Sequence, residues 1–192
     1  MSRIKNAFDH KKAFIGFLTA GDPTLDKTEE FVMEMVDAGA GLIELGIPFT
    51  DPIADGPVIQ EANIRALEAG CTTDKIFDMV ASLRKKTDVP IVFLGYLNTM
   101  FVYGYEKFCK RCQECGVDGL IVPDLPYEEK GELVPIAKAH GVNVITMIAP
   151  TSKQRIEMLA KEATGFIYVV SSMEQEARSR PIWLKSWKLS VV

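Results

Sequence analysis

The fold of this 192-residue chain is decided by Gly39-Ala-Gly-Leu-Ile-Glu-Leu-Gly-Ile-Pro-Phe-Thr-Asp-Pro-Ile-Ala-Asp-Gly-Pro57. Leu42 to Ile47 has the length and apolar density of a buried strand, and the prolines that follow end it because proline cannot donate to a strand ladder. Glu44 places a carboxylate in the middle of this strand, where burying a charge is costly unless it is used or paired. Asp51 and Asp55 follow in the loop, so three carboxylates gather at the carboxyl end of one strand.

The composition bounds the class of protein before any motif is considered. A hydrophobic content of 47% with 25% charged residues is typical of a globular domain with a sizeable core. The formal charge is -4 and no basic run is present, which argues against a nucleic-acid partner. No apolar run approaches the roughly 20 residues of a membrane span, and the first ten residues lack the apolar core of a secretory signal. We therefore expect no membrane partner and a cytoplasmic protein.

The chain repeats a strand, a turn and a helix every 25 to 35 residues or so, and its strands are continuously apolar. This rhythm predicts an α/β fold in which helices cover a parallel sheet. The expected strands are 13–19, 42–47, 88–96, 119–124, 142–148 and 165–172, and the expected helices are 23–38, 59–69, 72–86, 105–115, 124–140 and 151–163.

Two architectures give this rhythm: a doubly wound open sheet and a (β/α)8 barrel of the TIM type. A dinucleotide-binding open sheet carries a glycine-rich turn directly after its first strand. Gly39-Ala-Gly41 instead precedes a strand, so the barrel is favoured. Both folds hold their chemistry at the carboxyl ends of the strands, and polar or special residues gather there, namely Glu44, Asp51, Asp55, Tyr96, Asn98, Asp124, Tyr168 and Ser171.

Four segments together resemble the family of tryptophan synthase alpha subunits, over about residues 4 to 173. They are Phe17-Leu-Thr-Ala-Gly-Asp-Pro23, Glu44 to Pro57, Leu94-Gly-Tyr-Leu-Asn98 and Val122-Pro-Asp-Leu-Pro126. The resemblance implies a (β/α)8 barrel that cleaves indole-3-glycerol phosphate to indole and glyceraldehyde 3-phosphate. It further implies that the protein uses no cofactor and no metal, and that it passes indole to a pyridoxal-phosphate-dependent beta subunit.

The family roles carry over to the positions that match. Glu44 corresponds to the general acid/base and Asp55 to the carboxylate that holds the indole nitrogen. The walls of the indole pocket correspond to Phe17, Leu94 and Tyr168, and the loops that face the beta subunit hold Asp51, Pro52 and Asn98. The chemistry fits, because burial raises the pKa of a carboxyl such as Glu44 and suits it to donate a proton near neutrality, while a loop aspartate should stay ionised.

Ordinary structural roles also account for some of these residues. Glu44 could pair with a lysine or cap a strand edge, and Asp51 and Asp55 could simply form turns. Asp124 could cap a helix that begins at Pro126, and His140 suits a helix C-terminus. Three cysteines, Cys109, Cys112 and Cys115, have a spacing that begins like an iron-sulfur motif, but they fall on an amphipathic helical stretch and are expected to be packed free thiols.

The resemblance stops after Met173, and residues 174–192 contain both tryptophans of the chain. We expect residues 1–173 to form a partial TIM-barrel domain and 174–192 to be an unrelated tail, for which a shifted reading frame is one hypothesis. With about six βα units in place of eight, the barrel would be truncated and incomplete, with edges at the first and last strands. Such barrels commonly hold phosphate after strands seven and eight, so impaired cleavage is expected. The alternatives are a non-catalytic module that contacts the beta subunit and another phosphosugar barrel enzyme.

Overall fold

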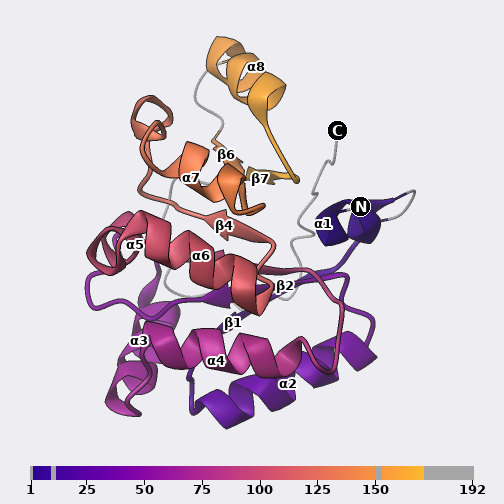
Figure 1. Cartoon of the computed structure of the whole chain (residues 1–192). Coiled ribbons are helices and arrows are strands. Elements are labelled where there is room, and N and C mark those ends of the chain that lie inside the picture. The colour runs from indigo at the N-terminus through magenta and orange to yellow at the C-terminus, as the bar shows by residue number, and fades with distance from the viewer. Residues whose placement is uncertain (1, 10–11, 150–152, 171–192) are drawn as a thin grey trace.

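A computed structural model describes residues 2–9, 12–149 and 153–170 (Figure 1). Parallel strands alternate with helices along the chain. The strands are β1 (Ile15–Thr19), β2 (Leu42–Gly46), β3 (Ile91–Leu94), β4 (Gly119–Ile121), β5 (Asn143–Val144), β6 (Thr146–Ile148) and β7 (Ile167–Val169). The helices are α1 (Arg3–Phe8), α2 (Leu25–Asp37), α3 (Pro57–Glu68), α4 (Thr73–Leu83), α5 (Leu97–Tyr103), α6 (Tyr105–Cys115), α7 (Leu133–Ala139), α8 (Lys153–Glu162) and the 3-10 helix η1 (Tyr127–Glu129).

The first five strands form one parallel sheet in the order β1-β2-β3-β4-β5, and β6 pairs with β7 in a second parallel ladder. The expectation of a single strand over 142–148 is wrong, because the chain changes neighbours at Ile145. Its amide donates to the Leu120 carbonyl of β4 at 2.8 Å, and the residues beyond it pair with β7 instead. The described strands therefore number seven, with β1 and β7 at the two ends of the series.

The helices depart from expectation in four places. The 124–140 helix is replaced by η1 and the shorter α7, and α1 and α5 are additional. Helix α2 begins later than expected, because Thr24 is its N-cap and accepts a hydrogen bond from the Lys27 amide at 3.2 Å. Asp22, expected as that cap, instead accepts two hydrogen bonds from Arg65 of α3. Figure 1 shows α2, α4, α6 and α7 lined up along one side of the strands.

Two apolar clusters lie on opposite faces of the strands. The helix-facing cluster includes Ile43, Leu45 and Phe93, which pack with side chains of α4 and α6. The inner cluster contains Leu42, Val92 and Ile121 of the sheet. Residues outside these strands close it, namely Ile4, Ile145 and Phe166. Because side chains alternate between the faces of a strand, both sides of β2 are buried, which is the pattern of a barrel wall.

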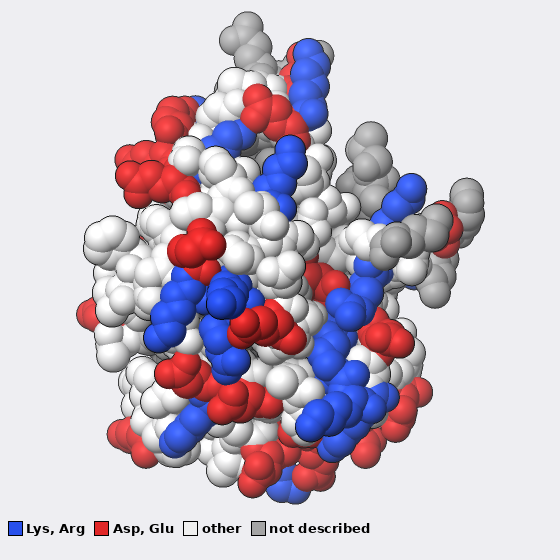
Figure 2. All heavy atoms as spheres, in the orientation of Figure 1, with Lys and Arg blue, Asp and Glu red and all other residues white. Residues whose placement is uncertain are grey.

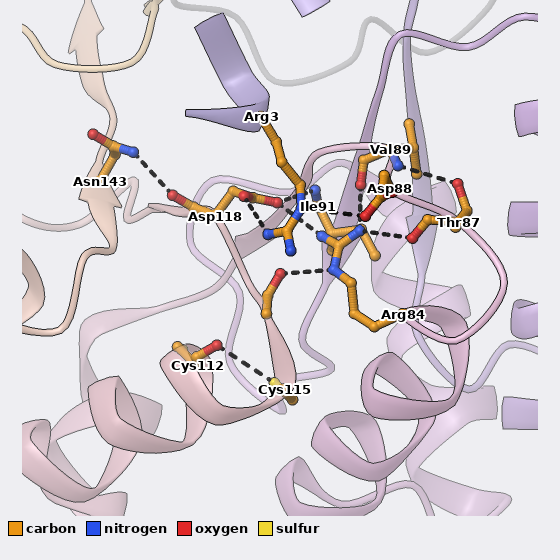
Figure 3. Close-up of polar contacts among 11 residues, drawn as sticks. Arg3, Arg84, Thr87, Asp88, Val89, Ile91, Cys112, Cys115, Asp118 and Asn143 are labelled. Carbon is orange, nitrogen blue, oxygen red and sulfur yellow. Dashed lines mark hydrogen bonds and ion pairs between the residues drawn. The ribbon is translucent and has the colours of Figure 1, made fainter. Parts of the chain in front are cut away.

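The amino ends of β3 and β4 are joined by a buried charged cluster (Figure 3). Arg84 and Asp118 are 10% and 9% exposed, and the guanidinium Nη2 donates to Oδ2 of the carboxylate at 2.8 Å. Asp118 also accepts from the Ile91 amide at 3.0 Å and from Arg3 Nη1 of α1 at 3.0 Å. The cluster therefore fastens the amino-terminal helix to two strands, at the end of the sheet opposite the carboxylate loop.

The surface carries both signs of charge. Figure 2 shows Lys and Arg side chains intermingled with Asp and Glu on the face that is in view. The longest helix described is α2, with 13 residues, and across residues 2–9, 12–149 and 153–170 no helix has the length and apolar character needed to cross a bilayer.

Candidate active site

Glu44 lies in the middle of β2 and points to the inner face. Its register partners are Phe17 in β1 and Val92 in β3, and it lies two residues from Leu42, which belongs to the inner cluster with Val92. Residues two apart on a strand share a face, so Glu44 extends the inner apolar cluster toward the carboxyl end of the sheet. The residue is only 5% exposed.

Burial dominates the electrostatics of Glu44. As expected from the sequence, removal from water raises the pKa of this carboxyl from its ordinary 4.5 to about 7. No hydrogen bond or opposite charge from the described part of the chain offsets this effect. Among the described residues Glu44 therefore neither pairs with a lysine nor caps a strand edge. A carboxyl with these properties exchanges a proton near neutral pH.

Tyr168 of β7 lies within electrostatic reach of Glu44. Burial is the main cause of its raised pKa, and the negative charge of Glu44 adds to it. Tyr168 and Leu94 are both half-buried and pack against the inner cluster. Phe17, also half-buried, approaches Gly46 so closely that a Cβ there would lie 2.9 Å from the ring Cζ. The structure thus brings Leu94 and Tyr168 to the inner cluster and Phe17 to the strand position beside Glu44.

Asp55 lies in the loop between β2 and α3 and is half-buried. Its Oδ2 accepts a hydrogen bond from Asn63 Nδ2 of α3 at 3.3 Å, and its backbone carbonyl accepts from Gln60 Nε2 at 2.9 Å. Burial raises the pKa of the Asp55 carboxyl, while hydrogen bonds from Asn63 and Tyr96 act in the opposite direction. Its position in a loop does not by itself predict that burial raises the Asp55 pKa.

The residues expected at a partner interface lie at the same end of the sheet. Asp51 and Asn98 are exposed and Pro52 is half-buried. The placement of Asn98 in a loop is wrong, because it lies in the first turn of α5. The loop is tied to the end of β3 through Tyr96, whose hydroxyl accepts from the Ala54 amide at 3.0 Å and whose ring stacks on Phe49 at 5.2 Å between centroids.

Two polar side chains at strand and helix ends have structural roles. Asp124 does not cap a helix that begins at Pro126; it accepts from the Leu97 amide at 2.9 Å and so caps α5. His140 follows α7, as expected, and its ring nitrogens lie 2.8 Å from side-chain oxygens of Gln113 and Glu106.

The cysteines are free and buried, as expected from their helical spacing. Cys109, Cys112 and Cys115 line the buried face of α6, and burial raises the pKa of each thiol. Within the described residues no group of three or more metal-ligating side chains occurs that could hold a metal ion.

A cavity of about 340 Å³ lies away from these residues. It opens between η1, α7 and α8 and is lined by apolar side chains such as Leu125, Val134 and Leu159. Neither Glu44 nor Asp55 lines it. Charged side chains line it as well, but Lys130 pairs with Glu162 and Arg155 with Glu128 at the surface. We assign the candidate site to the carboxylates at the strand ends, because Glu44 is a buried carboxyl that can act in acid–base chemistry.

Sequence reasoning missed Asn63. This residue is 4% exposed on the buried side of α3, and its partner is the carboxylate of Asp55. The signal that could have indicated it is an asparagine inside a helix, between Ala62 and Ala66. Asparagine is a poor helix former, and a buried amide needs a hydrogen-bond partner.

A parallel barrel wall with a buried carboxyl on one strand and a second carboxylate on the loop after it is an arrangement typical of barrel proteins that use acid–base chemistry. The chain belongs to the tryptophan synthase alpha chain family: the family model matches residues 4–177. This match confirms the resemblance found over residues 4–173.

Individual relatives agree with the family assignment. The tryptophan synthase alpha chain of Lacticaseibacillus casei is 53% identical over 173 residues, which cover 90% of this chain and 65% of that protein. A crystal structure of the alpha chain from Legionella pneumophila superposes with a TM-score of 0.83 at 37% identity, covering 88% of this chain and 66% of the other. A tryptophan synthase complex from Pyrococcus furiosus gives a TM-score of 0.77 at 39% identity, covering 82% and 65%. The chain thus spans about two thirds of the length of the relatives it matches.

Proposed function

We propose that this chain carries the acid–base site for retro-aldol cleavage of indole-3-glycerol phosphate to indole and glyceraldehyde 3-phosphate. The single observation behind the proposal is the carboxyl of Glu44, buried on the inner face of β2 with its pKa raised to about 7. A group of this kind is protonated in a useful fraction of molecules near neutral pH, and its conjugate base can take the proton back.

The cleavage needs a proton at indole C3, stabilisation of positive charge at the ring nitrogen and a base for the glyceryl hydroxyl. In the proposed mechanism Glu44 delivers the proton and serves as the base, and Asp55 faces the ring nitrogen as an anion. Phe17, Leu94 and Tyr168 form the apolar wall for the indole ring. These roles use only side chains of this chain, with no cofactor and no metal.

The rate of this reaction depends on more than the two carboxylates. In barrels of this type phosphate is commonly held by loops after strands seven and eight, and binding energy from a remote phosphate supports the chemical step. This chain spans about two thirds of its relatives. We therefore propose that the 192-residue chain, assayed alone, cleaves the substrate very slowly. We also keep the division into a barrel segment, 1–173, and a tail, 174–192, as a proposal; residues 171–192 lie outside the described residues.

The proposal is tested by assaying indole release from indole-3-glycerol phosphate on chain of verified intact mass. Glu44→Gln and Asp55→Asn remove the acid and the anion, and each is expected to abolish the residual release. Glu30→Gln changes an exposed carboxylate on α2 and is the matched control. Release that persists unchanged in both site variants would overturn the assignment of the two carboxylates. Turnover of the unmodified chain at the rate of a full-length relative would overturn the prediction of slow cleavage.

A second function, binding to a beta subunit, is favoured by the surface beside the site. Exposed apolar side chains lie there, with Ile53 70% and Phe101 64% exposed, next to Asp51, Pro52 and Asn98. Exposed apolar residues gathered on one loop and a neighbouring helix are typical of an interaction surface. We propose that this surface contacts the pyridoxal-phosphate-dependent beta subunit, and that the complex acts in the cytoplasm.

Binding is tested with a beta subunit of the same family in a serine-plus-indole assay. Stimulation of the beta reaction without indole release would support a non-catalytic module, and stimulation with release would support an active alpha chain. Phe101→Ser is expected to weaken the stimulation. Phe31→Ser, on the exposed face of α2, is the control for loss of an exposed phenyl ring. Equal effects of the two variants would place the interface elsewhere.

A further inference from the structure

Asn63 is buried in a place where asparagine is unfavourable. It lies in the interior of α3, between the buried residues Ala62 and Ala66, and is 4% exposed. Asparagine costs a helix roughly 0.5 kcal/mol more than alanine, and a buried amide without a partner costs about 1–3 kcal/mol. The described residues offer its side chain one partner, Oδ2 of Asp55, at 3.3 Å from Nδ2.

Two side chains donate hydrogen bonds to the carboxylate of Asp55, Asn63 and Tyr96, and other contacts hold the loop backbone. Gln60 Nε2 donates to the Asp55 backbone carbonyl, and the Ala54 amide donates to the Tyr96 hydroxyl. These two contacts fix the backbone on either side of the carboxylate. The Tyr96 hydroxyl also interacts with Asp55, so the carboxylate lies between α3 and the end of β3.

The helix that carries Asn63 is itself anchored. Arg65 donates from Nε and Nη2 to both carboxylate oxygens of Asp22, at 2.9 and 2.7 Å, which links α3 to the loop after β1. Ala66 is fully buried in the core. A donor on a fixed helix restricts the rotamers of a loop side chain more than a donor on the loop itself can.

We propose that Asn63 is a positioning residue that aims the Asp55 carboxylate into the site by a hydrogen bond from α3. The inference rests on the proposed function, because it assumes that Asp55 faces the substrate. Asn63 itself does not touch the reacting atoms. Its Nδ2 donates to the carboxylate, and a donated hydrogen bond favours the ionised form that the indole nitrogen requires.

The test compares Asn63→Leu, which removes the donor, with Asn63→Asp, which puts a second carboxylate beside Asp55. The control is Gln60→Leu, which removes a donor to the backbone carbonyl of Asp55 and leaves the carboxylate contacts intact. The first readout is the titration of the Asp55 side chain by carbon NMR on chain labelled at aspartate carboxyls. Asp55→Asn identifies the resonance by its disappearance. This readout does not depend on catalysis.

We expect the Asp55 pKa to rise by about one pH unit in Asn63→Leu and by more in Asn63→Asp, because two carboxylates in contact cannot ionise together easily. Gln60→Leu should leave it in place. The second readout is the pH profile of indole release, whose acidic limb should move upward with the NMR titration while KM changes less than kcat. Thermal unfolding of each variant confirms that the chain remains folded.

The outcomes separate the inference from the proposed function. If Asp55→Asn abolishes release but the NMR titration of Asp55 is unchanged in both Asn63 variants, the positioning role is wrong and the function stands. If the titration shifts as expected while Asp55→Asn leaves release unchanged, Asn63 still orients the carboxylate but Asp55 is not catalytic. An equal shift in Gln60→Leu would also overturn the positioning role, because it would trace the effect to loop order.

Discussion

Replacing Glu44 by glutamine should make the protein more stable at neutral and alkaline pH. The folded-state pKa of about 7 lies 2.5 units above the ordinary 4.5, and one unit corresponds to about 1.4 kcal/mol. Below about pH 4.5 the carboxyl is protonated in both states and costs nothing. As the pH rises from about 4.5 to about 7 the unfolded chain loses the proton first, so the folded state becomes less stable by about 3 kcal/mol and remains so above that range.

Glutamine is neutral at every pH and has the same shape, so the variant escapes this loss. We expect the difference in unfolding free energy between Glu44→Gln and the unmodified chain to grow by about 3 kcal/mol between about pH 4.5 and about pH 8. Urea unfolding followed by far-UV circular dichroism measures it at each pH. Glu30→Gln, on an exposed face, controls for the change in net charge. A difference that does not vary with pH would refute the reasoning that burial raises the Glu44 pKa.

Three further predictions concern the frame around the site. Asp118→Asn leaves the buried Arg84 guanidinium without its ion-pair partner and should lower the unfolding free energy by about 3–5 kcal/mol. The control, Glu30→Gln, breaks an exposed ion pair and should lower it by less than about 1 kcal/mol. Equal urea midpoints for the two variants would contradict this prediction. Gly46→Ala puts a methyl group 2.9 Å from the Phe17 ring and should lower the unfolding free energy by about 1–3 kcal/mol. It should also weaken indole binding, which an NMR titration measures. Unaltered stability and binding would show that the ring moves aside freely. Burial raises the pKa of the Cys109 and Cys115 thiols to about 11, so both should resist alkylation at about pH 8 until urea is added. Mass spectrometry follows the labelling. Rapid labelling of the native protein would count against their burial.

Sequence reasoning located the strands where local pattern determines them. The apolar run before Pro48 predicted a strand over 42–47, and the structure has β2 at Leu42–Gly46. The same reasoning could not see the break at Ile145, because an apolar run does not say which neighbour each half pairs with. Helix α5 was missed for a related reason: its cap is Asp124, 27 residues further along the chain. Both errors come from partners that are distant in sequence.

The candidate site divides in the same way. Glu44 stood out because a charge inside an apolar strand is anomalous, and its burial and raised pKa follow from that local setting. Asn63 did not stand out, because an asparagine in a helix is usually a surface residue. Only the folded chain brings it to Asp55. Residues whose role comes from their immediate neighbours can be predicted, and those whose role comes from packing between elements cannot.

The salt bridge between Arg3 and Asp118 joins residues that are 115 positions apart. Closing a loop of that length costs about 4 kcal/mol in chain entropy, more than an isolated ion pair returns. Helix α1 can therefore dock only after β3, β4 and Arg84 have assembled the rest of the cluster. During synthesis this means that α1 waits until the residues up to Asp118 have been made. We expect hydrogen exchange during refolding to protect α1 after β3 and β4.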